Sequence, residues 1–116
     1  MTFIAMDGSG APIGSVTVVQ HDMPDRSDLH HLSPWIAGMF VVPGERQKGV
    51  GSALMRHAAA KARLVGVREL FLYTSSARRF YERLGWTLLG DDFYEGEQVT
   101  IMRSRLTPLA DPPSAR

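Results

Sequence analysis

The sequence predicts an α/β fold built on one mixed sheet, and three observations support this class. Residues 2–20 contain two short apolar runs around a turn, which is the pattern of an antiparallel hairpin. Residues 35–74 show strand, helix and strand in succession, and such a crossover unit makes its two strands parallel neighbours. Residues 86–106 contribute two further strands. Antiparallel and parallel pairing are therefore expected in the same sheet.

The first elements follow from composition and periodicity. TFIAM (2–6) and PIGSVTVVQ (12–20) predict the two strands of the hairpin, because the DGSGAP between them is dense in turn residues. Residues 21–33 are polar and include a proline, so they predict a loop. WIAGMFVV (35–42) is almost wholly apolar, which is typical of a strand covered on both faces.

A helix is predicted over residues 49–65, where apolar side chains recur at nearly helical spacing. Gly66 is expected to end this helix. RELFLYT (68–74) predicts the strand that completes the crossover unit.

The last elements are shorter. Residues 76–85 predict a second helix that ends at a glycine. WTLLG (86–90) and EQVTIMRSRL (97–106) predict two strands joined by DDFYEGE. Residues 107–116 contain three prolines and no periodicity, so we expect a disordered tail after a single domain that spans residues 1–106.

Composition excludes several classes of protein. The chain has 116 residues, a net charge of +1 and no cysteine. A general nucleic-acid binder would carry a stronger basic excess, and disulfides or thiolate metal sites need cysteine. The four histidines show no metal-ligand spacing, so no metal is expected.

No apolar run reaches the ~18 residues of a membrane span, and the N-terminus lacks a signal-peptide pattern. A cytoplasmic protein is the resulting expectation.

The segment VVPGERQKGVGSALM (41–55) carries the clearest functional signal, because a glycine-rich turn directly precedes a helix. Gly49 and Gly51 lie in the first turn, and Arg46 and Lys48 add positive charge. Such a helix start exposes unpaired backbone N–H groups at the positive end of the dipole, which is the usual setting for a bound phosphate. The spacing fits neither the P-loop nor the dinucleotide-binding fingerprint.

Two motifs in register resemble those of one family. Val41-x-Pro43-x-x-Arg46-x-x-Gly49-x-Gly51-x-x-Leu54 closely resembles the acyl-CoA-binding motif of the GNAT superfamily of N-acetyltransferases. Phe80-Tyr81-Glu82-Arg83-Leu84-Gly85-Trp86 is similar to the second signature of that family, a Tyr-x-x-x-Gly-aromatic helix end. The matching block runs from about residue 35 to 106. The resemblance implies a GNAT-like, mostly antiparallel central sheet with a splayed parallel strand pair and helices on its faces.

The resemblance also implies acetyl-CoA as a co-substrate, with its pyrophosphate on the turn and its pantetheine arm between the two splayed strands. The turn would run from Arg46 to Ser52, with Arg46 adding positive charge. It would bind mainly through the backbone amides of Gln47, Lys48, Gly49, Val50, Gly51 and Ser52. Met39 and Val41 would offer backbone groups to the pantetheine amides, like an added strand. Thr74 falls where many relatives have an asparagine that contacts the cofactor.

For the chemistry, the resemblance implies that Tyr81 donates a proton to the leaving thiolate of CoA. A general base is less clearly marked. His31 is the candidate we favour because a histidine has a suitable unperturbed pKa, and His30 and Asp28 are alternatives in the same loop. Relatives also act without a dedicated base.

Together these features predict an acetyl-CoA-dependent N-acetyltransferase in which a primary amine attacks the thioester directly. The alternative is a CoA-binding regulatory module or pseudoenzyme without acceptor chemistry. The acceptor is expected to be a small-molecule or peptide amine. The acids within residues 91–97 are compatible with a cationic acceptor, although ordinary solvated loop charge is the explanation we favour.

The N-terminus departs from the family pattern, because most relatives begin with a strand and two helices before the hairpin. A naturally minimal domain, a fragment or mis-started reading frame, and a wall supplied by a second subunit are three explanations. In each case TFIAM becomes an exposed sheet edge, and such edges tend to pair with another chain. We therefore expect a homodimer or higher oligomer.

Overall fold

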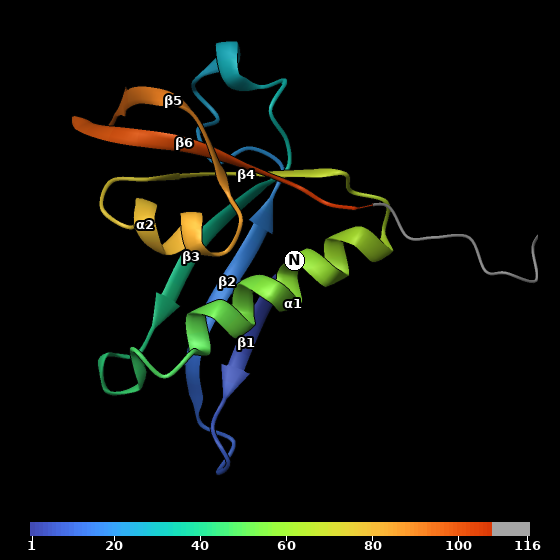
Figure 1. Ribbon diagram of the computed structural model, residues 1–116, viewed down its shortest axis with the longest axis vertical. Helices are drawn as coiled ribbons and strands as arrows, with labels where there is room; N and C mark the ends of the chain where they lie inside the picture. The colour runs from blue at the N-terminus through green and yellow to red at the C-terminus, as the bar shows by residue number, and fades with distance from the viewer. Residues whose placement is uncertain (108–116) are drawn as a thin grey trace, which may run out of the picture.

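The computed structural model describes residues 1–107 and contains a six-stranded sheet with helices on one face (Figure 1). The strand order is β1-β2-β3-β4-β6-β5. Only β3 and β4 are parallel, so the predicted mixed, mostly antiparallel sheet is confirmed. The predicted tail, except for Thr107, lies outside the described residues. The strands are β1 (Thr2–Met6), β2 (Pro12–Val19), β3 (Trp35–Val41), β4 (Glu69–Thr74), β5 (Thr87–Tyr94) and β6 (Glu97–Arg105).

The parallel pair β3 and β4 touches at one end and then separates. Trp35 lies opposite Phe71, and the ladder holds no further pair. A β-bulge in β3 accompanies the separation, because Gly38 and Met39 together face a single residue of β2, Val16. Gly38 has φ +59, a left-handed conformation that glycine adopts without steric cost. Since a bulge bends and re-aims its strand, it directs the second half of β3 away from β4.

The two helices cover one face of the sheet. Helix α1 (Val50–Leu64) runs across β1, β2 and β3, and the shorter α2 (Arg78–Arg83) follows β4 (Figure 1). The principal core lies between these helices and the sheet. Its buried members come from both layers and are Val16, Ile36, Leu54, Met55, Ala58, Ala62, Leu70, Leu72, Tyr81, Trp86, Met102 and Leu106.

The loop between β2 and β3 covers part of the opposite face. This loop, residues 20–34, includes a 3-10 turn at Ser27–Leu29 and buries Met23 against Trp35 and Phe71. The indole N–H of Trp35 donates a hydrogen bond to the carbonyl of Leu32 at 2.6 Å, which holds the end of the loop on the sheet. The predicted loop therefore has a defined path.

Strand β5 is longer than predicted, and this corrects the assignment of residues 91–97 to a connection. The strand continues through Asp91 and Asp92 to Tyr94, and the turn is limited to Glu95 and Gly96, with φ 51° and 81°. Aspartate has a low strand propensity. At the edge of a sheet, however, a charged side chain faces water and also discourages pairing with another chain.

An arginine clamp ties the covering loop to this edge strand. The Arg26 guanidinium donates hydrogen bonds at 2.9 Å to Asp28 in the loop and to Asp92 on β5. It also donates to the carbonyl of Phe93 at 3.2 Å. Hydrogen bonds from Arg26 hold the pKa of both carboxyls below the ordinary aspartate value of 3.8. Both ion pairs are therefore complete at neutral pH.

We expect Arg26→Gln to loosen the loop without unfolding the sheet, because the clamp is the main polar link between residues 22–28 and β5. Hydrogen exchange should show faster exchange in the loop amides and unchanged exchange in β4 and β6. In the wild type, the clamp should be intact above pH 3.8 and weaken as the pH falls through the depressed pKa values. Arg105→Gln, at another surface ion pair, is the matched control. Unchanged loop exchange in the Arg26 variant would contradict the role given to the clamp.

Strand β1 is one edge of the sheet, as expected from the sequence. Ile4 and Met6 point away from α1 and are 55% and 61% exposed. An uncharged edge strand with exposed apolar side chains can pair with a second chain. The homodimer stays a prediction.

Candidate active site

The turn before α1 presents a row of unused backbone donors. It follows a 3-10 turn at Pro43–Glu45 and contains two residues with positive φ, Gln47 at 64° and Gly49 at 84°. Gly49 is the N-cap of the helix, and its carbonyl accepts the first helical hydrogen bond, from Ala53. Within residues 1–107, nothing accepts a hydrogen bond from the N–H groups of residues 47–52. These donors and the helix dipole together form a site suited to an anion.

A groove of about 740 Å³ runs from this turn along the open side of β3. Its walls are formed by Met39 and Val41 on β3 and by Phe80 and Tyr81 on α2. Gly51 lies at its floor, where an added Cβ would come within 2.7 Å of the methyl group of Met39. The groove is therefore narrow at the helix start, and a side chain in place of Gly51 would obstruct it.

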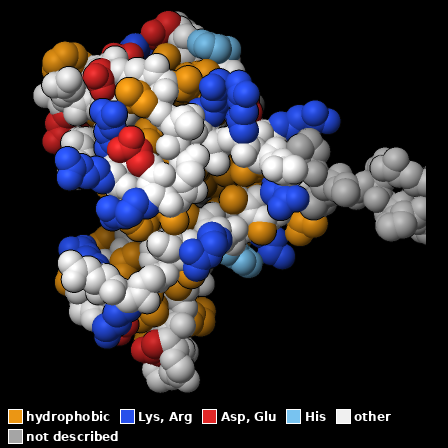
Figure 2. Space-filling view, in the orientation of Figure 1, with side chains coloured by type: hydrophobic (Ala, Val, Ile, Leu, Met, Phe, Trp, Pro, Cys, Tyr) orange, Lys and Arg blue, Asp and Glu red, His pale blue; other side chains and the backbone are white. Residues whose placement is uncertain are grey.

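Positive charge surrounds the groove. Arg46 and Arg83 line it, and Glu45 is the acidic residue among the described lining residues. Arg46 is held in place because its Nε–H donates to the carbonyl of Val41 at 2.9 Å and its guanidinium lies 5.8 Å from the centre of the Phe40 ring. Figure 2 shows Lys and Arg side chains over α2 and along α1 on this face. An anionic ligand would find favourable electrostatics here.

Tyr81 stands at the inner end of the groove, and the helix end explains its position. Gly85, with φ +94, closes α2, and the N–H of Trp86 returns to the carbonyl of Tyr81 at 3.1 Å. This hydrogen-bond pattern is a Schellman motif, which brings the residue after the glycine back onto the helix. The ring of Trp86 accordingly packs edge-on against Tyr81, with centroids 6.2 Å apart. The Tyr-x-x-x-Gly-aromatic spacing thus fixes the tyrosine ring.

The hydroxyl of Tyr81 is available for chemistry. The residue is 8% exposed, and the described residues offer this hydroxyl no hydrogen bond. Burial raises its pKa above the ordinary value of 10.0, so the group stays protonated at neutral pH. A neutral hydroxyl in this position can donate a hydrogen bond or a proton.

A second cavity, of about 400 Å³, begins on the other side of Tyr81. It lies between the separated halves of β3 and β4. Met39, Ser76, Ala77 and Tyr81 line both this cavity and the groove, so the two spaces meet at the tyrosine. A ligand in the groove and a second molecule in the cavity could therefore approach each other beside the Tyr81 hydroxyl.

Two carboxylates, Asp22 and Glu97, line the second cavity. Asp22 belongs to the covering loop and Glu97 begins β6. Burial raises the pKa of the Asp22 carboxyl above 3.8. Burial also raises the pKa of Tyr73, a neighbour in the cavity, and the charges of Asp22, Glu95 and Glu97 add to this effect. Sequence reasoning did not single out Asp22, because nothing in the sequence indicates which loop residue turns inward.

The other predicted site residues occupy different positions. Lys48 is exposed and forms an ion pair with Glu45 at 3.6 Å, and Val50 packs its side chain against the core. Thr74 lines the second cavity, where its hydroxyl accepts a hydrogen bond from the N–H of Ala77 at 2.9 Å. His31 is exposed in the covering loop and lines neither the groove nor the second cavity. The structure therefore does not bring His31 together with Tyr81.

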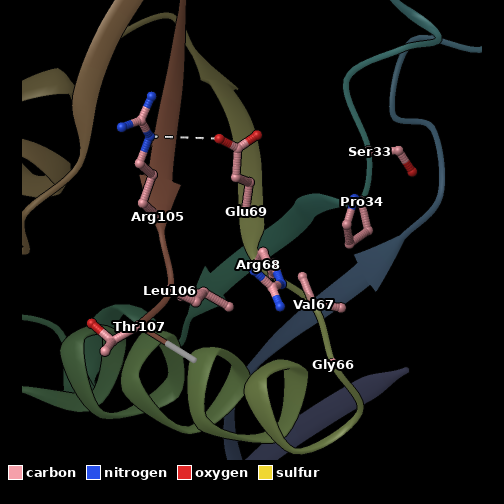
Figure 3. Close-up of a pocket in the computed structure, with 9 residues that line it drawn as sticks. All are labelled: Ser33, Pro34, Gly66, Val67, Arg68, Glu69, Arg105, Leu106 and Thr107. Atoms are coloured by element: carbon pink, nitrogen blue, oxygen red, sulfur yellow. Dashed lines mark ion pairs between the residues drawn. The ribbon is translucent and has the colours of Figure 1, made fainter. Parts of the chain in front are cut away.

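A third cavity, of about 790 Å³, lies at the opposite end of β4 and β6 and contains none of the predicted site residues. Figure 3 shows Arg105 and Glu69 facing each other across its rim, in an ion pair of 3.6 Å. It is open and lined by Leu106 and Thr107, next to the part of the chain that is not described. Its size alone gives it no chemical role.

The splayed parallel pair, the glycine-rich helix start and the tyrosine between two cavities define the class of this domain as an acyltransferase fold. Comparison with known proteins agrees. The sequence matches the family described as "Acetyltransferase (GNAT) domain" over residues 1–88. The chain belongs to the GNAT family of acetyltransferases.

Individual relatives support the same assignment. The chain is 33% identical over 101 residues to a streptothricin acetyltransferase of Streptomyces lavendulae, covering 82% of this chain and 50% of that protein. It thus spans about half the length of this curated relative. The crystal structure of a nourseothricin acetyltransferase is 31% identical, with a TM-score of 0.72, and the match covers 91% of this chain and 65% of that one. An aminoglycoside 6'-N-acetyltransferase complexed with coenzyme A shares the fold at 15% identity, with a TM-score of 0.75, over 95% of this chain and 74% of that one.

None of the helices in residues 1–107 is both long and apolar enough to cross a membrane. The same residues contain no group of three His, Asp or Glu side chains arranged to hold a metal ion. The absence of a metal from the reaction stays a prediction.

Proposed function

We propose that this domain transfers an acetyl group from acetyl-CoA to a primary amine. One observation carries the proposal: the turn at residues 47–52, whose N–H groups have no acceptor within residues 1–107, lines a groove through Gln47, Gly49, Gly51 and Ser52. The same groove reaches Tyr81. The diphosphate of CoA would accept hydrogen bonds from the turn, and the extended pantetheine arm would run along β3. Bound coenzyme A in an aminoglycoside acetyltransferase of the same fold supports this choice of ligand.

The groove suits the middle of the cofactor as well as its diphosphate. The edge of β3 that faces β4 has no ladder partner beyond Trp35, so backbone groups near Met39 and Val41 would pair with the amides of pantetheine. The Val41 carbonyl already accepts a hydrogen bond from Arg46. Such pairing adds a strand-like segment to an open edge. The thioester would then lie where the two strands separate, next to Tyr81.

In the reaction, the neutral amine attacks the thioester carbonyl, a C–N bond forms and the C–S bond breaks. Tyr81 donates its proton to the departing sulfur, and the oxygen of Tyr81 regains a proton as the attacking nitrogen loses one. The products are the acetylated amine and CoA thiol. No covalent enzyme intermediate is needed, because the two substrates would meet in adjoining cavities.

The acceptor is proposed to be a small molecule. The streptothricin, nourseothricin and aminoglycoside acetyltransferases are named for small-molecule acceptors, which supports this class. The alternative is a CoA-binding module without acceptor chemistry. The second cavity beside Tyr81 favours the enzyme, since a pure binder has no need of a space for an acceptor.

Calorimetric titration tests the cofactor assignment. CoA and 3'-dephospho-CoA, which both carry the diphosphate, should bind, and pantetheine, which lacks it, should bind at least 100-fold more weakly. That factor corresponds to about 2.8 kcal/mol at 1.4 kcal/mol for each tenfold change. Equal affinity for pantetheine and CoA would refute a diphosphate site on the turn, and so would the absence of CoA binding.

A further inference from the structure

We propose that Asp22 binds the reacting ammonium group of the acceptor and takes its proton, and that the acceptor is a cationic amine whose remaining charge faces Glu97. The inference rests on the proposed function, since it concerns the second substrate of that reaction. It is carried by the charge of the two cavities, the lack of a partner for Asp22 and the path of the covering loop.

The two spaces on either side of Tyr81 carry opposite charge. Arg46 and Arg83 line the groove with one acid, Glu45, whereas the charged residues that line the second cavity are Asp22 and Glu97. Lysine, arginine and histidine are absent from the described residues around that cavity. An anionic cofactor and a cationic acceptor would therefore each be attracted to its own side. A negatively charged acceptor would meet two carboxylates without a compensating cation.

Asp22 differs from the other loop carboxylates in having no partner among the described residues. Asp25 accepts a hydrogen bond from the Tyr94 hydroxyl at 3.1 Å, and Asp28 is paired with Arg26. In residues 1–107, by contrast, neither an ion pair nor a hydrogen bond engages the Asp22 carboxylate. A half-buried carboxylate without a partner is costly, and a bound ammonium group would compensate it.

The covering loop gives Asp22 a fixed position. Arg26 anchors the loop to β5 through Asp92, and Ser33 anchors its far end by donating a hydrogen bond to the carbonyl of Gln20 at 2.8 Å. Met23, next to Asp22, is 2% exposed and belongs to the second core. With its neighbour buried and its loop clamped, Asp22 is held at the cavity wall, which a proton acceptor requires.

The proton balance follows from this arrangement. The acceptor enters as an ammonium ion and gives one proton to the Asp22 carboxylate, and the freed amine attacks the thioester. When the C–N bond has formed, the nitrogen loses a second proton, and this proton goes to the oxygen of Tyr81, which has protonated the sulfur. Asp22 later releases to solvent the proton that it took from the ammonium ion. The pKa of Asp22, raised by burial, makes this carboxylate a better proton acceptor than an exposed aspartate.

Two probe amines of equal length test the charge preference. Cadaverine and 5-aminopentanoate share the same reactive end, and their far ends are cationic and anionic respectively. We expect cadaverine to bind the CoA-loaded wild-type protein at least tenfold more tightly in a calorimetric titration. Equal binding, tighter binding of 5-aminopentanoate, or no binding of either up to millimolar concentration would overturn the proposal.

The variant Asp22→Asn tests the residue. With cadaverine and acetyl-CoA, kcat/KM should fall by about 100-fold or more, in the range expected for loss of a general base, while the Kd of CoA stays within twofold. Asp91→Asn is the matched control, because Asp91 lies on β5 outside both cavities and, within residues 1–107, its carboxylate accepts a side-chain hydrogen bond from Thr100 alone. Full activity of Asp22→Asn would overturn the proposal.

The readouts separate the two proposals. Failure of CoA to bind the wild-type protein refutes the proposed function before any amine is added. Normal CoA binding without a preference for the cationic probe refutes only the present inference. If Asp22→Asn does not fold, the comparison of the two amines on the wild-type protein still decides the outcome.

Discussion

Replacing Tyr81 with phenylalanine is expected to lower kcat by about 100-fold or more and to leave the Kd of CoA within twofold. Positioned proton donors contribute about 10²–10⁴ to rate, and this hydroxyl is the free donor at the junction of the two cavities. The turn proposed to bind the diphosphate does not depend on the hydroxyl. Steady-state kinetics with saturating acetyl-CoA and a calorimetric titration measure the two quantities.

Stability should hardly change in this variant, which makes it a clean test. The ring contacts to Phe80 and Trp86 are retained by phenylalanine, and in the described part of the chain the lost hydroxyl has no partner to leave unpaired. Tyr73→Phe is the matched control, because Tyr73 also lines the second cavity but not the groove, and its loss should cost far less rate. Full activity of Tyr81→Phe would show that the thiolate leaves without this donor. A wild-type protein that binds CoA but acetylates no amine would favour the binding-module alternative.

The order of elements was predictable from the sequence because it depends on local patterns. The apolar run at 35–42, the helical spacing at 49–65 and the glycine after each helix correspond to β3, α1 and the observed helix ends. The splay of β3 had a weaker signal. Gly38 interrupts an apolar strand, and an isolated glycine there indicates a bulge, but the direction in which the strand bends depends on its neighbours.

The site residues also differ in how well the sequence predicts them, because some depend on local patterns and others on long-range contacts. The turn with free backbone donors could be predicted because these donors are consecutive, so the amides of residues 47–52 follow from glycines and a helix start. Its binding of a phosphate stays a prediction. Asp22 and His31 lie in one polar loop. Only the three-dimensional path of this loop determines which of the two residues reaches the second cavity. The burial of Met23 and the clamp at Arg26 turn Asp22 toward the second cavity and leave His31 exposed. These contacts are long-range, so a local pattern cannot rank the two residues.

The sequence failed to predict the second half of β5 for a related reason. Asp91 and Asp92 disfavour a strand by propensity, yet Asp92 accepts the Arg26 clamp and Asp91 accepts a hydrogen bond from Thr100 at 3.2 Å. Partners from the loop and from β6 therefore offset the propensity. The same clamp that lengthens the edge strand also holds the loop that carries Asp22, so the edge of the sheet and the wall of the second cavity depend on one arginine.

The variant Ser52→Asp is expected to stabilise the fold while it abolishes most cofactor affinity. Ser52 is the third residue of α1 and lines the groove, and the first turn of this helix contains no acidic residue. A carboxylate there would interact favourably with the helix dipole, which contributes about 0.3–1 kcal/mol, or about 2–5 °C in Tm for a domain of this size. Thermal unfolding without ligand measures this gain.

The same carboxylate would occupy the position proposed for the CoA diphosphate. Two like charges ~4 Å apart repel by about 4 kcal/mol at an effective dielectric constant near 20, and salt reduces this, so we expect the Kd of CoA to rise by about 100-fold. Ser52→Asn, which has the same shape without the charge, should keep most of the affinity and gain less stability. A gain in stability combined with a loss of affinity distinguishes a ligand site from a structural turn, because damage to the turn would lower both. Undiminished CoA binding by Ser52→Asp would mean that the diphosphate lies elsewhere.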